Sequence, residues 1–382
     1  MAFTKIQAAQ LFDGYRLMSN KVLIVQQDGT IEAIVEADAA GDGVRQLKGI
    51  LSPGFINCHC HLELSHLKGM IVENTGLAGF AGEVVQKRNK EPHLIAQAIS
   101  DADANMQKNG IVAVGDICNT ADTLLTKSES PILYHNFIEA LGFNPDVATP
   151  NFERYKKTFE TFTKIFPPKQ VSITPHAPYS VSEVLWKKIL EHDPSGVFSI
   201  HNQETIDETQ WFFDKTGGFV GMFDRLGLKT DSFTASGKSS LQTFLPKFAP
   251  TQQLLLVHNV CTQPDDISFA QQLHPHLFWC LCPNANQYIS QAMPPLPLFL
   301  EQQCTVVLGT DSLASNHQLS IWEEIRTLQK AFPQTSLAQM LGWATINGAK
   351  ALKLDESLGS FEPGKKPGLV HIDNNQATRF LP

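Results

Sequence analysis

A chain of 382 residues with 42% hydrophobic and 18% charged residues is typical of a soluble globular protein, with room for one large domain and a small one. The formal net charge of -8 argues against a broad basic surface for nucleic acid or anionic lipid, although a small charged ligand needs only local complementarity. No apolar stretch reaches the roughly 18 residues of a membrane span, and the N-terminus lacks an apolar signal region, so we expect a cytoplasmic protein.

The first fifty residues predict short β-strands. The segment "KVLIVQQDGTIEAIVEA" (21–37) holds two apolar runs around Asp28-Gly29, which is a strong hairpin signal. A break at Pro53-Gly54 marks the predicted domain boundary. Neither residues 1–52 nor the turn-rich tail, residues 356–382, could bury a core alone, so we expect the two segments to form one small β domain.

Residues 53–355 predict eight strands that alternate with helices. The strand segments share continuous apolar runs, typical of parallel strands buried on both faces. In chain order they are "GFINCHCH" (54–61), "GIVAVGDI" (110–117), "ILYHNFIEAL" (132–141), "QVSITPHA" (170–177), "VFSIHNQE" (197–204), "QLLLVHNV" (253–260), "LFWCLCPNAN" (277–286) and "TVVLGTDS" (305–312). Helical patterns lie at 93–110, 151–168, 180–192 and 336–352, and the third opens with Ser180 and Glu183 at the spacing of a capping box. The alternation indicates an α/β fold, a (β/α)8 barrel.

Histidine and acidic residues gather where these strands end, which is where such barrels carry their reacting groups. They are His59 and His61 on the first strand, His176 on the fourth, His201 and Glu204 on the fifth, His258 on the sixth and Asp311 on the eighth. A lone histidine at a strand end is usually an ordinary hydrogen-bonded residue, but one at each of several strand ends is hard to explain in that way.

The strand ends predict a metal site. His59 and His61 are alternate residues of one strand, so both imidazoles can face the barrel axis. Three imidazoles and one carboxylate suit a divalent ion such as zinc, with one position left for water. We therefore predict that His59, His61, His201 and Asp311 are the ligands. The fourth strand lacks a lysine that could bridge two ions, which favours a single ion.

The seven cysteines predict reduced and mostly buried thiols, because their number is odd and several lie inside apolar runs. Cys280 and Cys282 invite a rival zinc interpretation. No second cysteine pair with zinc-finger spacing follows them, so we interpret the pair as structural thiols.

Six motifs together resemble the amidohydrolase superfamily, in its deaminase and chlorohydrolase branch. They are "PGFINCHCHLELSHLKG", "TPHAPYSVS", "SIHNQET", "LLLVHN", "CPNANQYI" and "LGTDSLASN", in order from residue 53 to residue 316. This branch includes guanine, cytosine, adenosine-type and aminodeoxyfutalosine deaminases. The resemblance implies a distorted (β/α)8 TIM barrel, residues 53–355, and a small β-sandwich built from both termini. The family pattern differs here at Asn202 and Gln203, where small or apolar residues are usual.

The resemblance also implies roles for individual residues. His59, His61, His201 and Asp311 match the metal ligands. Glu204 matches a proton-transferring acid, His258 a histidine that orients water and substrate, and Asp311 also accepts a proton from the water. His176 matches a substrate-side histidine. The candidates for substrate contact are Glu63, His176, Ser312, Ser315 and Asn316, and the segment 216–240 has glycines and aromatics suited to a lid or a stacking wall.

The implied function is a metal-dependent hydrolytic deaminase of an amino-substituted purine-type heterocycle or nucleoside, with aminodeoxyfutalosine as one candidate. A metal-bound hydroxide would attack the amine-bearing ring carbon, and ammonia would leave. The cofactor is one divalent ion, Zn2+ or alternatively Fe2+. Two alternatives stay open: a hydrolase of a cyclic amide or carbon–halogen bond, and a non-catalytic, metal-stabilised binding protein. The partner is a small-molecule substrate, and the resemblance leaves a homodimer open.

Overall fold

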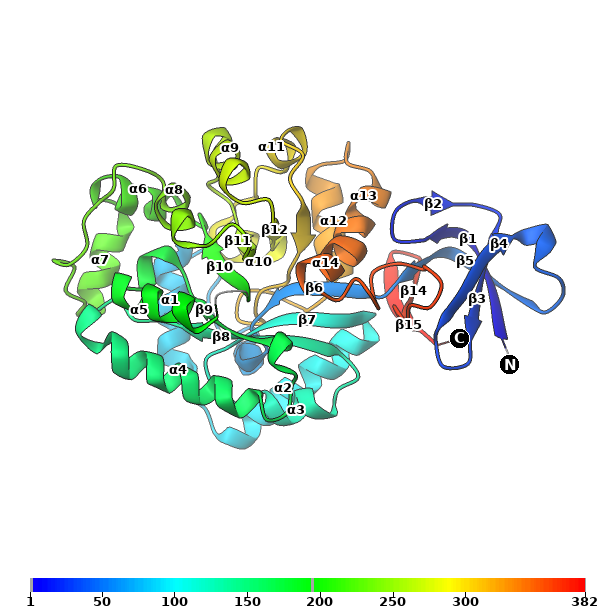
Figure 1. The fold of residues 1–382 in the computed structure, drawn as a ribbon, viewed down its shortest axis with the longest axis horizontal. Coiled ribbons are helices and arrows are strands. Elements are labelled where there is room, and N and C mark those ends of the chain that lie inside the picture. Colours follow the sequence, from blue (N-terminus) through cyan, green and yellow to red (C-terminus); the bar gives the residue numbers. More distant parts are fainter. Residues whose placement is uncertain (1–2, 194–195, 382) are drawn as a thin grey trace.

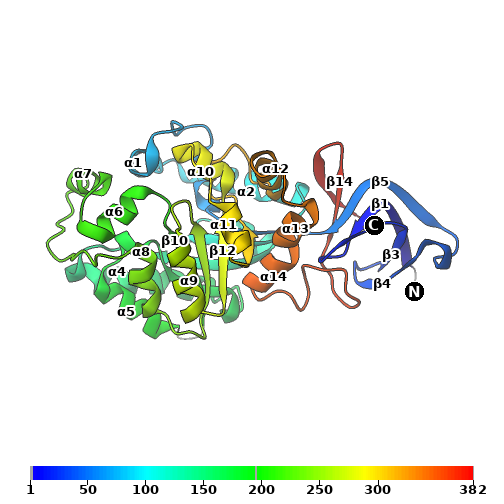
Figure 2. The same cartoon turned by 90° about the horizontal axis from the view of Figure 1, so that it is seen from above.

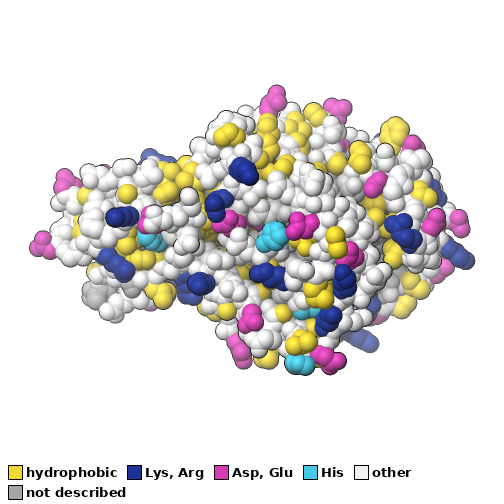
Figure 3. All heavy atoms as spheres, turned by 180° about the vertical axis from the view of Figure 1, so that it is seen from behind, with side chains coloured by type: hydrophobic (Ala, Val, Ile, Leu, Met, Phe, Trp, Pro, Cys, Tyr) yellow, Lys and Arg dark blue, Asp and Glu magenta, His cyan; other side chains and the backbone are white. Residues whose placement is uncertain are grey.

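The computed structural model describes residues 3–193 and 196–381, so the outermost residues of both predicted terminal segments lie outside it. Both ends of the chain contribute strands to one seven-stranded sheet at one end of the molecule, while α6 (Ile206–Asp214) and α7 (Gly218–Arg225) lie at the other end (Figures 1 and 2). On the face shown in Figure 3, basic and acidic side chains are interspersed. In the described part of the chain, no helix is long and apolar enough to span a membrane.

The sheet of the two termini has the order β15-β14-β5-β1-β3-β4, with β2 beside β1. Its strands are β1 (Phe3–Phe12), β2 (Leu17–Met18), β3 (Lys21–Gln26), β4 (Ile31–Glu36), β5 (Val44–Pro53), β14 (Leu369–Asp373) and β15 (Gln376–Phe380). The hairpin predicted at Asp28-Gly29 is confirmed, because β3 and β4 pair antiparallel around it. The division into domains at residues 52/53 and 355/356 stays a prediction.

The eight predicted strands form two parallel four-stranded sheets rather than one closed barrel. The first sheet holds β6 (Phe55–Cys60), β7 (Ile111–Cys118), β8 (Leu133–Ala140) and β9 (Val171–Pro175), and the second holds β10 (Val197–Asn202), β11 (Gln253–His258), β12 (Leu277–Leu281) and β13 (Val306–Leu308). Most of their residues are buried, as the apolar runs predict.

The expectation of a closed barrel is corrected at two seams. Between β9 and β10, the side chain of Thr174 bonds the backbone of Ser199, where a ladder would use backbone groups alone. Between β13 and β6, the backbone N–H groups of Thr310 and Asp311 both donate to the carbonyl of His59, at 3.0 and 3.1 Å. At these two seams, the continuous ladder of backbone hydrogen bonds that a closed barrel would have is therefore interrupted.

Helices connect the strands and pack around them (Figure 1). Besides α6 and α7 they are α1 (Gly76–Lys87), α2 (Pro92–Lys108), α3 (Leu124–Glu129), α4 (Ala148–Phe162), α5 (Glu183–His192), α8 (Ser240–Phe244), α9 (Pro264–Leu273), α10 (Pro283–Ser290), α11 (Leu296–Glu301), α12 (Ile321–Ala331), α13 (Leu337–Gly342) and α14 (Gly348–Ala351). The predicted capping box at Ser180 is wrong. Helix α5 begins at Glu183 after Ser182, and the Ser180 hydroxyl instead lies 2.7 Å from Nδ1 of His176.

Candidate active site

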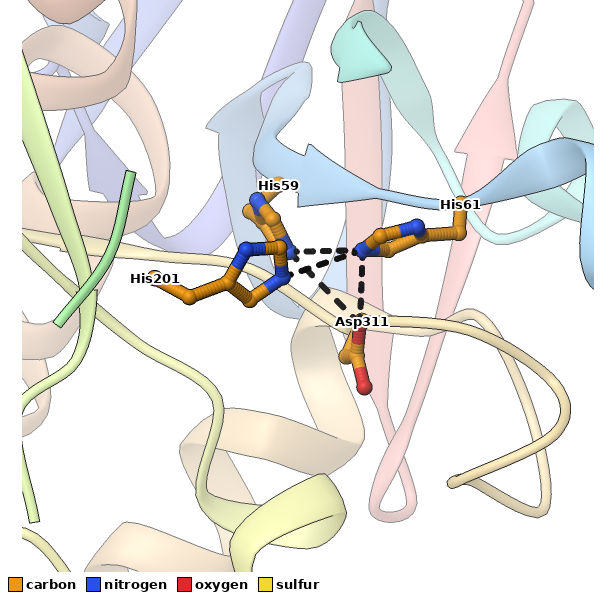
Figure 4. Close-up of side chains that lie close together, drawn as sticks. All are labelled: His59, His61, His201 and Asp311. Atoms are coloured by element: carbon orange, nitrogen blue, oxygen red, sulfur yellow. Dashed lines mark hydrogen bonds and ion pairs between the residues drawn. The ribbon is translucent and has the colours of Figure 1, made fainter. Parts of the chain in front are cut away.

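Four side chains from three strand ends converge on one point (Figure 4). The Nε2 atom of His61 lies 3.2 Å from Nε2 of His59, 3.3 Å from Nε2 of His201 and 3.3 Å from Oδ1 of Asp311. His59 and His61 lie at the end of β6 and His201 lies near the end of β10, while Asp311 follows β13. The structure thus brings together the four residues that the sequence predicts as metal ligands.

The geometry and chemistry of this group fit a tetrahedral divalent ion. Two imidazole nitrogens at about 2.0–2.1 Å from a tetrahedral zinc ion lie about 3.3 Å apart. The Nδ1–H of His201 donates to the carbonyl of His176 at 2.8 Å, so its Nε2 carries a lone pair that faces the Nε2 atoms of His59 and His61. Lone pairs turned toward one another in a buried site are favourable only when a cation lies between them.

Burial prepares these groups for metal binding. It lowers the pKa of His61 to about 3 and the pKa of His201 well below its usual range, so both imidazoles are neutral at pH 7. Burial opposes the charged form of Asp311. The neighbouring imidazoles of His59, His61 and His258 favour its ionised form, outweigh that effect and hold its pKa well below the ordinary range. Neutral imidazoles and an ionised carboxylate are the forms that bind a metal.

Glu204 and His258 lie beside the four-ligand group as a second pair. The Nε2 atom of His258 is 3.7 Å from Oε1 of Glu204, and its ring stacks on His201 at 5.5 Å between centroids. The other ring nitrogen, Nδ1, lies 2.7 Å from Oδ1 of Asn286 on α10. Burial raises the pKa of Glu204, although the neighbouring His258 opposes the shift. The carboxyl of Glu204 therefore holds a proton more readily than an exposed glutamate does.

The four-ligand group and the Glu204–His258 pair lie at a pocket of about 750 Å³. Its walls are largely apolar and include Leu77, Phe80, Val84, Phe143, Met222, Phe223, Leu226 and Leu228. Segment 216–240, which the sequence identifies as a lid or wall, supplies the last four through α7 and the turn after it. His61, His201, Asp311, Glu204 and His258 all line this pocket, so three of the four predicted metal ligands share it with the proton-transfer groups, while His59 is buried beside them.

The five predicted substrate contacts divide into two groups. His176 and Ser312 line the pocket, whereas in the described part of the chain Glu63, Ser315 and Asn316 do not. Glu63 accepts hydrogen bonds from the backbone N–H groups of Asn119 and Thr120, at 2.9 and 3.1 Å, and pairs with Arg88. Ser315 donates to Asp311, and Asn316 donates to the carbonyl of Thr310 and to Glu324. These three residues therefore hold neighbouring residues of the site in place by hydrogen bonds and do not line the pocket.

Polar pocket residues that the sequence interpretation missed include Arg88, Asn119, Glu139 and Arg154. Glu139 lies near the end of β8, so the rule that found the histidines could have found it too. Arg88 follows α1 and Arg154 lies within α4, and only the packing of these helices brings their guanidinium groups to the pocket. Asn286 belongs to the quoted motif "CPNANQYI", where no role was assigned to it.

Comparison with known proteins places these features in context. The chain matches the model of the amidohydrolase family over residues 50–381. It is 28% identical to an adenosine deaminase of Helicobacter pylori over 334 residues, which cover 86% of this chain and 80% of that protein. The structure of Helicobacter pylori aminofutalosine deaminase with methylthio-coformycin superposes with a TM-score of 0.84 at 23% identity, covering 99% of this chain and 93% of that one. A zinc-bound adenosine deaminase from Xanthomonas campestris superposes with a TM-score of 0.72 at 21% identity, covering 97% and 84%.

Proposed function

The chain belongs to the amidohydrolase family, and from this premise we propose that it is a metal-dependent hydrolytic deaminase of adenine nucleosides. The proposal is supported above all by the convergence of His59, His61, His201 and Asp311 at the edge of the pocket that also holds Glu204 and His258. In the net reaction, the oxygen of water replaces the amine on the ring carbon, and ammonia is released.

We propose one zinc ion as the cofactor, with Fe2+ as the alternative, held by His59, His61, His201 and Asp311. The donor set of three imidazoles and a carboxylate supports this assignment. When bound, the ion supplies Lewis-acid activation of the attacking water.

The remaining steps belong to side chains of this chain. The carboxylate of Asp311 can accept a proton from the water, and Nε2 of His258 can orient that water by hydrogen bonding. Glu204 can protonate the ring nitrogen next to the reacting carbon, because burial favours its neutral form. Glu204 can then take up the remaining proton of the attacking water and pass it to the departing amine, which leaves as ammonia, and the proton held by Asp311 restores Glu204. Proton transfers of this kind contribute roughly 10²- to 10⁴-fold each.

The rest of the pocket indicates what the nucleoside carries at its 5′ end. The apolar wall of α1 and α7 can cover an apolar substituent, and Arg88 and Arg154 line the same pocket. Arg88 already pairs with Glu63, whereas the guanidinium of Arg154 contacts the hydroxyl of Tyr155 at 2.7 Å. Two guanidinium groups beside an apolar wall suit a substituent that ends in a carboxylate. Aminodeoxyfutalosine, whose 5′ substituent is an aromatic carboxylate, is the substrate we propose.

We also propose that the two parallel sheets are halves of one distorted (β/α)8 barrel. Their strands follow one another in chain order, β9 lies against β10, and β13 contacts β6. A single bridge joins Cys60 to Asp311 at the second seam. This arrangement supports the idea that all eight strand ends open toward the same pocket. A homodimer and a cytoplasmic location stay predictions from the sequence.

The test is ammonia release by the zinc-loaded protein. The panel holds adenosine, 5′-methylthioadenosine, aminodeoxyfutalosine, guanine, cytosine, a cyclic amide and a chlorinated triazine. We expect ammonia from the adenine nucleosides, with the highest kcat/KM for aminodeoxyfutalosine. Glu204→Gln should keep its metal and lose roughly 10²- to 10⁴-fold in kcat. Hydrolysis of only the amide or the triazine would instead support the alternative hydrolase, and equal kcat/KM for the methylthio and carboxylate nucleosides would contradict the role of the two arginines.

A further inference from the structure

One buried carboxyl group faces the pocket without a role in the proposed reaction. Glu139, near the end of β8, is 2% exposed, and it lines the pocket together with Asn119, His176 and His201. Its Oε2 atom accepts a hydrogen bond from Nδ2 of Asn119 at 2.9 Å. Its Oε1 atom has no hydrogen-bond partner among the described residues.

The nearest charged neighbour of this oxygen does not satisfy it. Oε1 of Glu139 lies 3.5 Å from Nδ1 of His201, and the proton on that nitrogen already points to the carbonyl of His176 at 2.8 Å. A buried carboxylate oxygen without a donor is costly, and such atoms in native proteins call for an explanation. Because Glu139 itself lines a cavity that takes a ligand, a group on the ligand can supply the missing donor.

The chemistry of an adenine nucleoside limits which donor this can be. The ring nitrogens N1, N3 and N7 are acceptors, and the exocyclic amine is the group that leaves at the metal site. The hydroxyl groups of the ribose are the donors that remain. We propose that Glu139 accepts a hydrogen bond from a 2′- or 3′-hydroxyl of the substrate and thereby selects a ribonucleoside. This inference rests on the proposed function.

A cation is the other occupant that these residues could hold, since ligand atoms of Glu139, His176 and His201 lie within 4.8 Å of one another. Two of the ring nitrogens are already used. Nδ1 of His201 donates to a carbonyl, and Nδ1 of His176 is 2.7 Å from the Ser180 hydroxyl. A second ion would have to break the first of these bonds or bind with two protein ligands, so a substrate hydroxyl fits the geometry better.

Glu139→Gln tests the proposal sharply because Asn119 fixes its orientation. The Asn119 amide donates to the Oε2 side, so the carbonyl oxygen of glutamine should take that place and its NH2 group should replace Oε1. The acceptor that lacks a partner then becomes a donor. Glu208→Gln is the matched control: Glu208 is also fully buried with one oxygen lacking a partner, and in the described part of the chain it is not among the pocket residues.

The measurement is kcat/KM of the zinc-loaded enzyme for adenosine, 2′-deoxyadenosine and 3′-deoxyadenosine, together with inhibition by inosine and the two deoxyinosines. We expect wild type to lose about 10- to 100-fold with at least one deoxynucleoside, and Glu139→Gln to lose a similar factor on adenosine with no further loss on that analogue. Inhibition constants should follow the same pattern. Glu208→Gln should discriminate as wild type does.

Several results would overturn the inference. Equal wild-type kcat/KM for all three nucleosides would remove the ribose contact and leave the proposed deaminase activity intact, even if Glu139→Gln failed to fold. Undiminished discrimination in Glu139→Gln would do the same. Loss of a second metal equivalent in that variant would assign the carboxyl to a cation. Failure of wild type to deaminate any adenine nucleoside would instead reject the proposed function on which the inference rests.

Discussion

His258 can orient the attacking water only if a lone pair on Nε2 faces the pocket. The 2.7 Å contact between its Nδ1 and Oδ1 of Asn286 provides this, because a proton on Nδ1 donates to the amide oxygen and leaves Nε2 free. Asn286 is itself buried on α10. The amide therefore acts through His258 as a positioning residue and does not need to touch the substrate.

Replacement of Asn286 should impair turnover more than binding. In Asn286→Leu the imidazole loses the acceptor that fixes its tautomer, so we expect kcat to fall about 10- to 100-fold with little change in metal content or KM. Asn284→Leu is the control, because Asn284 lies on α10 like Asn286 but bonds Glu324 and Thr327 on α12, and it makes no hydrogen bond with His258 in the described part of the chain. Steady-state kinetics and metal analysis of both variants are the measurement. Equal losses of kcat would contradict the positioning role.

The sequence was sufficient for residues whose position follows from strand periodicity. His59, His61, His201 and Asp311 end apolar runs, so a barrel-like arrangement brings them together. Arg88 and Arg154 lie on or beside helices, and only the packing of α1 and α4 turns them toward the pocket. Glu63 lies in the short 3-10 helix Leu62–Leu67 after β6, where its carboxylate accepts hydrogen bonds from the backbone of residues 119 and 120, and its contact with substrate stays a prediction.

At the scale of elements, the strands were predictable and the seams were not. Continuous apolar runs mark each strand in the sequence, but the contact at the first seam depends on the Thr174 hydroxyl, which bonds the backbone of Ser199 25 residues later. Helix α7, which forms part of the pocket wall, also depends on a bond between a side chain and the backbone. Its first backbone N–H group, at Gly218, donates to Oδ1 of Asp207 at 2.8 Å. A carboxylate from α6 thus caps the helix that carries Met222 and Phe223 into the pocket.

Asp207→Ala should therefore loosen the pocket wall without touching the chemistry. Loss of a capping carboxylate costs about 1 kcal/mol of helix stability, so we expect KM to rise several-fold while kcat changes little. Asp224→Ala removes an exposed carboxylate from α7 itself and should leave both constants unchanged. Steady-state kinetics on one adenine nucleoside decide the matter. A fall in kcat with constant KM would show that the cap affects the reacting groups instead.

At the scale of the whole molecule, buried carboxyl groups make stability depend on pH. Burial raises the pKa of Glu208 to about 7 and the pKa of Glu324 to about 8, from an ordinary value of 4.5. The folded state therefore holds protons that the unfolded chain releases. The stabilisation is complete below pH 4.5 and is lost as pH rises through the folded pKa values, so the free energy of unfolding should fall from about pH 5 to pH 8 and level off above that.

Glu324→Gln should flatten that dependence, because glutamine does not titrate. The measurement is urea unfolding of the zinc-saturated protein from pH 6 to pH 9, with Glu301→Gln, on the end of α11, as the control. The control should keep the wild-type slope. A free energy of unfolding that rises with pH, or an unchanged slope in Glu324→Gln, would contradict the assignment.

The central claim is that residues far apart in sequence hold one ion and that this ion enables deamination. The most direct measurement is zinc content per chain beside ammonia release, for wild type and for His201→Ala. We predict one zinc per chain and ammonia release from an adenine nucleoside in wild type, and loss of both in the variant with its fold retained. Wild-type zinc content and wild-type ammonia release in His201→Ala would contradict the account.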